Sequence, residues 1–137
     1  MGIAGIDHIG LTVADVDRSA RWYEDVLGFT TVGRQEEEGE SGLRKMVFMT
    51  CPGLATAFGF VSHQSSAGAA FDETVAGLDH LSFQLADLEE IDDWAQRLQH
   101  LKVEYSQPTD STLRPGAKVL VFRDPDNIQL ELYALPT

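Results

Sequence analysis

GIDHI at residues 5–9 returns as GLDHL at residues 77–81, so His8 and His80 lie 72 positions apart. The repeat stays in register beyond this segment, because Trp22 and Trp94 are separated by the same 72 positions. A period of about half the chain differs from the short, many-fold repeats of a solenoid. The sequence therefore predicts two modules related by a pseudo-twofold axis, with one histidine at the same place in each.

Each module is predicted to begin with the strand that carries its histidine, because apolar and polar side chains alternate over residues 6–13 and 78–85. A helix follows each strand, with Asp15 and Asp87 placed as N-caps. Further strands are predicted after each helix, over residues 29–35, 43–50, 54–62, 103–106, 118–123 and 128–134. The fold class that follows is α+β, built from two βαβββ modules.

The length of 137 residues suits one compact domain in which the two modules share a core. Module 1 is predicted at about residues 1–62 and module 2 at about residues 76–137. The segment between them, about residues 63–75, is rich in polar and small residues, as is typical of a linker.

The composition restricts the classes of partner. Acidic residues outnumber Lys and Arg by 22 to 10, and the net charge of −12 argues against nucleic acid or an anionic membrane. No apolar stretch approaches the ~20 residues of a membrane span, and the N-terminus does not resemble a signal peptide, so we expect a cytoplasmic protein. The single cysteine, Cys51, has no partner for an intramolecular disulfide and is interpreted as a small hydrophobic residue.

Three polar side chains lie on the inner faces of predicted strands. His8 and His80 occupy equivalent positions, and Glu131 lies between Leu130 and Leu132, which face the opposite way. A carboxylate there is costly to bury unless a cation compensates its charge. Two imidazoles and one carboxylate form a set that leaves coordination positions open for water, substrate or dioxygen. The alternative is that both histidines are hydrogen-bonded core residues and Glu131 is an edge residue.

Several motifs together carry a family resemblance over nearly the whole chain: HIGLTVAD at residues 8–15, Trp22-Tyr23 before LGF at 27–29, LDHLSF at 78–83 and FRDPDNIQLEL at 122–132. With them the chain resembles the vicinal oxygen chelate (VOC) superfamily. That group includes glyoxalase I, bleomycin-resistance proteins, extradiol dioxygenases, fosfomycin-resistance enzymes and methylmalonyl-CoA epimerase. The resemblance implies that the paired modules form an open barrel-like cleft and that the metal ligands are His8, His80 and Glu131.

Differences between subfamilies bear on the reaction. Glyoxalase I and the epimerase add a fourth ligand from the last strand of the first module, where residues 55–60 offer no strong ligand here. Three ligands resemble the ring-cleaving dioxygenases and the fosfomycin enzymes. The fosfomycin enzymes usually carry a threonine two residues after the first histidine, whereas this chain has Gly10. Many extradiol dioxygenases have four modules, so that match is also imperfect.

Three further residues are candidates for catalysis or substrate contact. His63, at the end of the fourth predicted strand, is a candidate acid-base group or supplementary ligand, the alternative being a merely exposed side chain. Tyr133 and Gln129 share a strand face with Glu131, so both are candidates for contacting an oxygenated substrate. Ordinary cross-strand packing is the alternative for these two.

The function that we expect is that of a divalent-metal-dependent enzyme whose small-molecule substrate chelates the metal through vicinal oxygens. Dioxygenase-type chemistry with Fe²⁺ or Mn²⁺ ranks first, and glyoxalase-type lyase or epimerase chemistry with Zn²⁺, Ni²⁺ or Co²⁺ second. The alternative from another class is a non-catalytic drug- or ligand-binding protein similar to bleomycin-resistance proteins. A homodimer is expected, because pairing across a twofold axis would cover exposed sheet edges.

Overall fold

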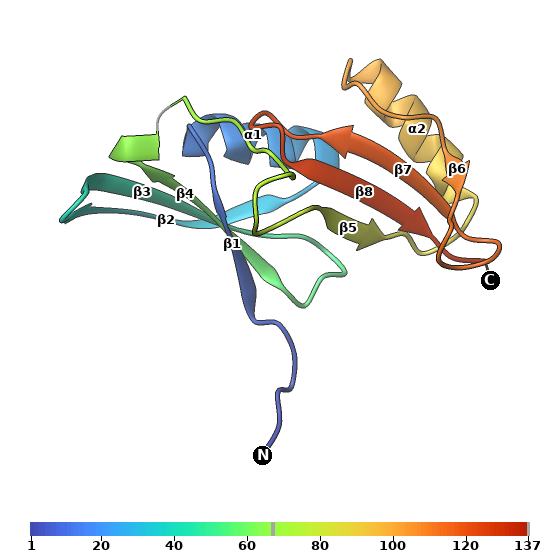
Figure 1. Cartoon of the computed structure of the whole chain (residues 1–137), viewed down its shortest axis with the longest axis horizontal. Coiled ribbons are helices and arrows are strands. Elements are labelled where there is room, and N and C mark those ends of the chain that lie inside the picture. The colour runs from blue at the N-terminus through green and yellow to red at the C-terminus, as the bar shows by residue number, and fades with distance from the viewer. Residues whose placement is uncertain (67, 137) are drawn as a thin grey trace. The chain divides into compact units, whose positions relative to one another are not determined.

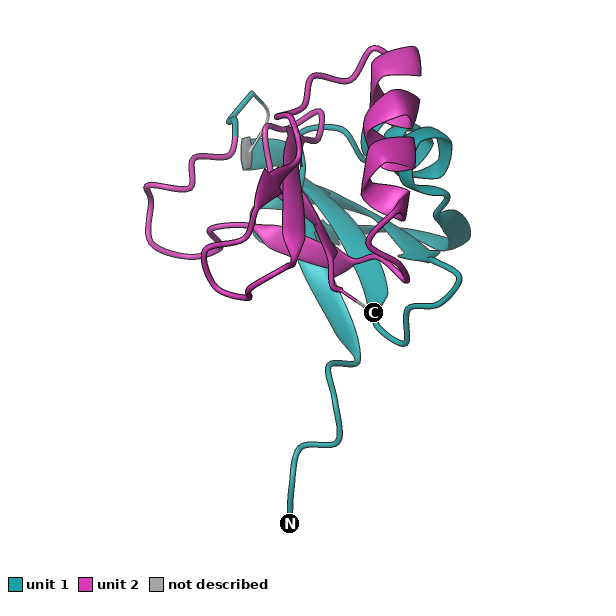
Figure 2. Ribbon diagram, turned by 90° about the vertical axis from the view of Figure 1, so that its right-hand side faces the viewer, with its two compact units in different colours: residues 1–70 teal, residues 71–137 magenta. Residues whose placement is uncertain are grey.

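The structure is a computed structural model that describes residues 1–66 and 68–136. The chain folds into two compact units, residues 1–70 (unit 1) and residues 71–137 (unit 2), which Figure 2 distinguishes by colour. No helix within the described ranges combines the length and the hydropathy that a membrane span requires.

Unit 1 contains one helix and a four-stranded mixed sheet (Figure 1). Its elements are β1 (His8–Thr12), α1 (Val16–Leu27), β2 (Thr30–Gly39), β3 (Gly42–Thr50) and β4 (Ala57–His63), followed by the short η1 (Gln64–Ser66). The strand order is β1-β4-β3-β2, with β1 parallel to β4 and the other pairs antiparallel.

Unit 2 repeats this topology. Its elements are β5 (Leu81–Gln84), α2 (Glu90–His100), β6 (Thr109–Asp110), β7 (Lys118–Arg123) and β8 (Gln129–Ala134). The strand order is β5-β8-β7-β6, and again only the first pair, β5 and β8, is parallel. The predicted α+β class with two βαβββ modules is therefore confirmed.

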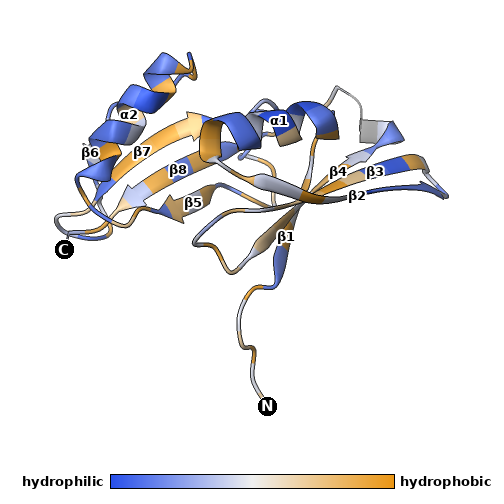
Figure 3. Cartoon of the chain, turned by 180° about the vertical axis from the view of Figure 1, so that it is seen from behind, coloured by the Kyte–Doolittle hydropathy of each residue, from blue (hydrophilic) through white to orange (hydrophobic). Residues whose placement is uncertain are grey.

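Each helix packs on one face of the sheet in its own unit, and that face is apolar. Helix α1 contacts β3 and β4, where Phe58 and Phe60 are buried, and α2 contacts β7 and β8, where Leu130 and Leu132 are buried. Figure 3 shows α2 as mainly hydrophilic, while β7 and β8 carry hydrophobic stretches. Because strand side chains alternate, the residues between these buried ones lie on the sheet face that the helix leaves uncovered.

The two helices begin differently. Asp15 is the N-cap of α1, as predicted, since its Oδ1 accepts hydrogen bonds from the backbone N–H groups of Asp17 (2.9 Å) and Arg18 (3.1 Å). The prediction that Asp87 caps the second helix is wrong, because α2 begins at Glu90 after a turn. There, the Glu90 carboxylate accepts a hydrogen bond from the backbone of Ala86 (3.2 Å).

The strands of unit 2 depart from prediction at two places. The predicted strand at residues 103–106 is wrong: Tyr105 forms only an isolated bridge to Phe122, and the paired strand is Thr109–Asp110. Pro108 precedes that strand and has no N–H for a ladder, which interrupts continuous pairing. The strand predicted at residues 78–85 is shorter, so His80 lies immediately before β5.

Candidate functional site

Both histidines of the repeat are held by the aspartate that precedes them. The Nδ1 atom of His8 lies 2.7 Å from Asp7 Oδ2, and the Nδ1 atom of His80 lies 2.6 Å from Asp79 Oδ1. An ionised carboxylate only accepts hydrogen bonds, so Nδ1 carries the proton in each pair. The Nε2 lone pair is then available as a metal ligand in both units.

Unit 2 brings two of the three predicted ligands together. Strand β5 places Ser82 directly beside Glu131 of β8 in the parallel register, and His80 stands two residues before Ser82. The Nε2 atom of His80 lies 3.6 Å from Oε2 of Glu131. Only 17% of the Glu131 side chain is exposed, compared with 40% for His80. The half-buried carboxylate thus points toward the free nitrogen of the imidazole.

The spacing of this donor pair is close to the spacing that one divalent ion requires. Two donors at about 2.1 Å from the same ion, at octahedral or tetrahedral angles, are about 3.0–3.4 Å apart. The observed separation of 3.6 Å between Nε2 and Oε2 is close to that range. Within residues 1–66 and 68–136 no cluster of three or more His, Cys, Asp or Glu side chains has the geometry of a metal site. Within the described part of unit 2, the donors that could hold an ion are therefore this one pair.

His8, the third predicted ligand, belongs to unit 1. It is the first residue of β1, where it pairs with Ala57 of β4, and 66% of its side chain is exposed. The same register pairs Gly10 with Gly59. Gly59 therefore occupies, in unit 1, the position that Glu131 occupies in unit 2, and it has no side chain to donate a ligand.

Tyr133 lines the same pocket of unit 2 as His80 and Glu131, a cavity of about 290 Å³. The hydroxyl of Tyr133 is hydrogen-bonded to that of Ser111, in the loop between β6 and β7. Arg114 of the same loop also lines the pocket, with its guanidinium carbon 5.7 Å from the centroid of the Tyr133 ring. Sequence reasoning missed Ser111 and Arg114, because a loop without periodicity gives no signal of which side chains reach a pocket.

Gln129 is engaged in a different network. Its side-chain oxygen accepts a hydrogen bond from Arg123 Nη2 (3.0 Å), and the same guanidinium donates to both carboxylate oxygens of Glu73 (2.6 and 2.9 Å). These hydrogen bonds lower the pKa of Glu73 to about 2. Gln129 therefore helps to hold Arg123 and does not line the pocket of Tyr133.

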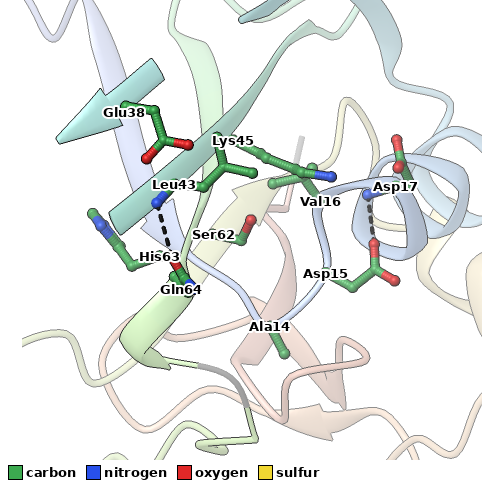
Figure 4. A pocket seen from close by; sticks show the side chains of 10 residues that line it. All are labelled: Ala14, Asp15, Val16, Asp17, Glu38, Leu43, Lys45, Ser62, His63 and Gln64. Atoms are coloured by element: carbon green, nitrogen blue, oxygen red, sulfur yellow. Dashed lines mark hydrogen bonds between the residues drawn. The ribbon is translucent and has the colours of Figure 1, made fainter. Parts of the chain in front are cut away.

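The structure does not bring His63 to His8. The two residues belong to neighbouring strands, but His8 pairs with Ala57 and His63 is the last residue of β4, six positions further on. At about 3.3 Å per residue this is about 20 Å along the strand. His63 instead lines a separate cavity of unit 1, of about 620 Å³, with Lys45 and Asp15 (Figure 4).

Cys51 behaves as a packing residue. Its thiol lies 3.9 Å from the carbonyl oxygen of Leu27, and burial raises the pKa of the thiol. A raised pKa lowers the thiolate fraction at neutral pH, which is the opposite of what a nucleophilic cysteine needs.

Comparisons with known proteins agree on one family. A family model described as the Glyoxalase/Bleomycin resistance protein/Dioxygenase superfamily matches residues 5–132. A solved glyoxylase/bleomycin resistance protein/dioxygenase domain from Frankia sp. EAN1pec is 30% identical, with a TM-score of 0.82, over 97% of this chain and 98% of that one. No curated protein matches the chain.

Two further solved structures differ in what they bind. The fosfomycin resistance protein FosX from Listeria monocytogenes, solved with Mn(II), is 25% identical, with a TM-score of 0.70, over 98% of this chain and 94% of that one. The antibiotic-binding protein TnmS3 from Streptomyces sp. CB03234 is 18% identical, with a TM-score of 0.71, over 100% and 99% of the two chains. At that identity TnmS3 shows the fold alone.

Proposed function

Because the chain belongs to the Glyoxalase/Bleomycin resistance protein/Dioxygenase superfamily, we propose that it is a divalent-metal-dependent enzyme acting on a small molecule with vicinal oxygens. His80, Glu131 and His8 are the proposed ligands. The observation that carries the proposal is the 3.6 Å separation between His80 Nε2 and Glu131 Oε2, with Nδ1 of the same imidazole held by Asp79. The repeat supports His8 as the third ligand, because Asp7 holds His8 in the same way.

The residues around the pair have separate roles in this proposal. Asp79 orients the imidazole of His80, and the half-buried Glu131 contributes the negative charge that favours a cation. A bound divalent ion would supply Lewis acidity toward the substrate oxygens. Tyr133, on the same strand face as Glu131, would contact the bound substrate.

The ligand set favours Mn²⁺ or Fe²⁺, and FosX, solved with Mn(II), supports the former. Dioxygenase-type chemistry ranks ahead of lyase or epimerase chemistry with Zn²⁺, Ni²⁺ or Co²⁺. The reason is that Gly59, at the position equivalent to Glu131, provides no fourth ligand and leaves more coordination positions open to small molecules.

The second candidate is a ligand-binding protein without catalysis. The position of His63, six residues along β4 from the partner of His8, favours it, because the proposed acid-base histidine is then remote from the His8 end of the strand. Turnover separates the two candidates: oxygen uptake with catechols supports the dioxygenase, while tight ligand binding without product supports the binder.

Metal content is the first test. We expect about one Mn²⁺ or Fe²⁺ per chain after reconstitution and dialysis, measured by plasma mass spectrometry, and loss of the ion in His8→Ala, His80→Ala and Glu131→Gln. His100→Ala is the control, because His100 is an exposed residue at the end of α2. Equal metal content in all four variants, or none in the wild type, would refute the proposal. Light scattering on the same sample tests the proposed homodimer, against which a mass of one 15.1 kDa chain would count.

A further inference from the structure

The pocket of unit 2 contains a cation without an acidic partner. Arg114 is exposed at its margin, and within the described part of the chain its guanidinium forms no ion pair. Arg34, Arg44 and Arg123, by contrast, are each paired with a carboxylate. With 22 acidic residues for 10 basic ones, carboxylates are abundant, so an unpaired arginine beside a pocket is the exception here.

Tyr133 presents a hydrogen-bond donor to the same pocket. The Ser111 Oγ atom accepts from the backbone N–H groups of Leu113 (3.1 Å) and Arg114 (3.3 Å). A hydroxyl oxygen has two lone pairs, so these two bonds fill its acceptor capacity. The proton of Ser111 is therefore the one shared with Tyr133, and the Tyr133 O–H is left to donate elsewhere. The same Ser111 fixes the backbone from which the Arg114 side chain extends.

We propose that Arg114 and Tyr133 bind an oxyanion group of the ligand, a carboxylate, phosphate or phosphonate, beside the His80–Glu131 pair. A guanidinium offers planar donors that match two oxygens of such a group, and the phenol donates a further hydrogen bond. This inference rests on the proposed function in one respect: the oxyanion belongs to the same molecule that the metal centre would bind. A cavity of about 290 Å³ is of a size that suits a small molecule.

Metal and oxyanion are expected to bind cooperatively. The Glu131 carboxylate shares the pocket with Arg114, so its negative charge opposes an incoming anion. A divalent ion on His80 and Glu131 reverses the local charge and favours the anion, and by linkage the anion favours the metal.

The test is calorimetric titration of metal-free and Mn²⁺-loaded protein with methylphosphonate and with acetate, with acetamide as the neutral control. We expect at least one anion to bind and Mn²⁺ to raise its affinity. Arg114→Gln should weaken anion binding about tenfold or more, Arg114→Lys less, and Tyr133→Phe about threefold. The matched control is Arg97→Gln, because Arg97 also lies 5.7 Å from an aromatic ring centroid, that of Trp94, but does not line the pocket.

The outcomes separate the two proposals. Normal Mn²⁺ content with no binding of either anion, or equal affinity in the wild type and Arg114→Gln, overturns the oxyanion site and leaves the metal centre standing. Arg114-dependent anion binding in a protein that takes up no metal supports the oxyanion site and refutes the metal centre. Circular dichroism and the Arg114→Lys variant guard against a folding defect. Selectivity between methylphosphonate and acetate identifies the class of oxyanion.

Discussion

Units 1 and 2 repeat one backbone with different cores. In unit 1 the core is aromatic, with the Tyr23 ring centroid 4.5 Å from that of Phe60. In unit 2 the positions equivalent to Phe58 and Phe60 hold Leu130 and Leu132, which are as completely buried. The strand order and the parallel first pair are nevertheless the same. The alternation of apolar and polar positions therefore specifies this topology, and the shape of the core side chains is secondary.

The two units differ at one equivalent position of the sheet face opposite the helix. Where unit 2 places Ser82 beside Glu131, unit 1 places Gly10 beside Gly59. Both units keep the aspartate-held histidine. The repeat thus retains the imidazole in both units and the carboxylate in one, so only unit 2 brings an imidazole and a carboxylate together at these repeat positions.

The largest expected effect concerns the aromatic core. Phe60 is fully buried against Tyr23 and Phe58, so Phe60→Ala should lower the free energy of unfolding by about 3–5 kcal/mol. Phe60→Leu introduces the residue that the repeat holds at the equivalent position and should cost about 1–2 kcal/mol. Urea denaturation measures both.

The two Phe60 variants also test whether the core of unit 1 accepts the aliphatic packing of unit 2. A loss in Phe60→Leu as large as that in Phe60→Ala would mean that unit 1 requires aromatic shape at this position. Leu132→Ala serves as the matched change in unit 2, where a loss of about 2–5 kcal/mol is expected.

The second prediction concerns a variant that gives unit 1 the carboxylate that unit 2 carries. Gly59→Glu places a carboxylate in unit 1 at the register position of Glu131, and a Cβ there would lie 3.7 Å from the Phe48 ring, an ordinary contact. If His8 is a ligand, the new carboxylate should raise Mn²⁺ affinity about tenfold, which is about 1.4 kcal/mol. Competition with a fluorescent chelator measures the change.

Gly59→Gln is the control for this substitution, because it has the same length but a neutral, weaker ligand group. Equal Mn²⁺ affinity in Gly59→Glu and Gly59→Gln would speak against a metal near His8. A gain in Gly59→Glu that disappears when His8→Ala is added would support His8 as a ligand.

The sequence predicted the family, the α+β class and most elements, because strand alternation and the repeat act over many residues. The bounds of β7 (Lys118–Arg123) were predicted without error, and the buried side of β8 follows from the alternation of Leu130 and Leu132 with Glu131. The left-handed backbone of Asn127 (φ 68°) in the turn before β8 suits the turn preference of asparagine.

The sequence did not predict contacts that depend on where a side chain ends. Strand alternation predicts that adjacent residues such as Asp7 and His8 face opposite ways. The Asp7 carboxylate nevertheless reaches the imidazole, because the direction of Cβ does not fix the position of the terminal atoms. The signal was present, because Asp7 and Asp79 recur with the two histidines. Arg114 gave no such signal, because its position depends on the conformation of an irregular loop.

The last and smallest effect tests the two helix starts. Asp15→Ala removes the hydrogen bonds to the N–H groups of Asp17 and Arg18 and should cost about 1 kcal/mol, measured by urea denaturation at pH 7. Asp87→Ala should change stability by less than about 0.5 kcal/mol, because α2 begins three residues later and Asp87 is not its N-cap. Equal losses in the two variants would restore Asp87 as a cap in solution.

The dependence of this effect on pH has a definite sign. The hydrogen bond from the Arg18 backbone, above all, lowers the pKa of Asp15. A carboxyl whose pKa is lower in the folded state stabilises the fold above its ordinary pKa, and this contribution is lost as the pH falls through the lowered value. The gap between the wild type and Asp15→Ala should therefore be full at pH 7 and shrink in acid. A gap that stays constant down to the acid transition would mean that the Asp15 cap acts without its charge, through hydrogen-bond geometry alone.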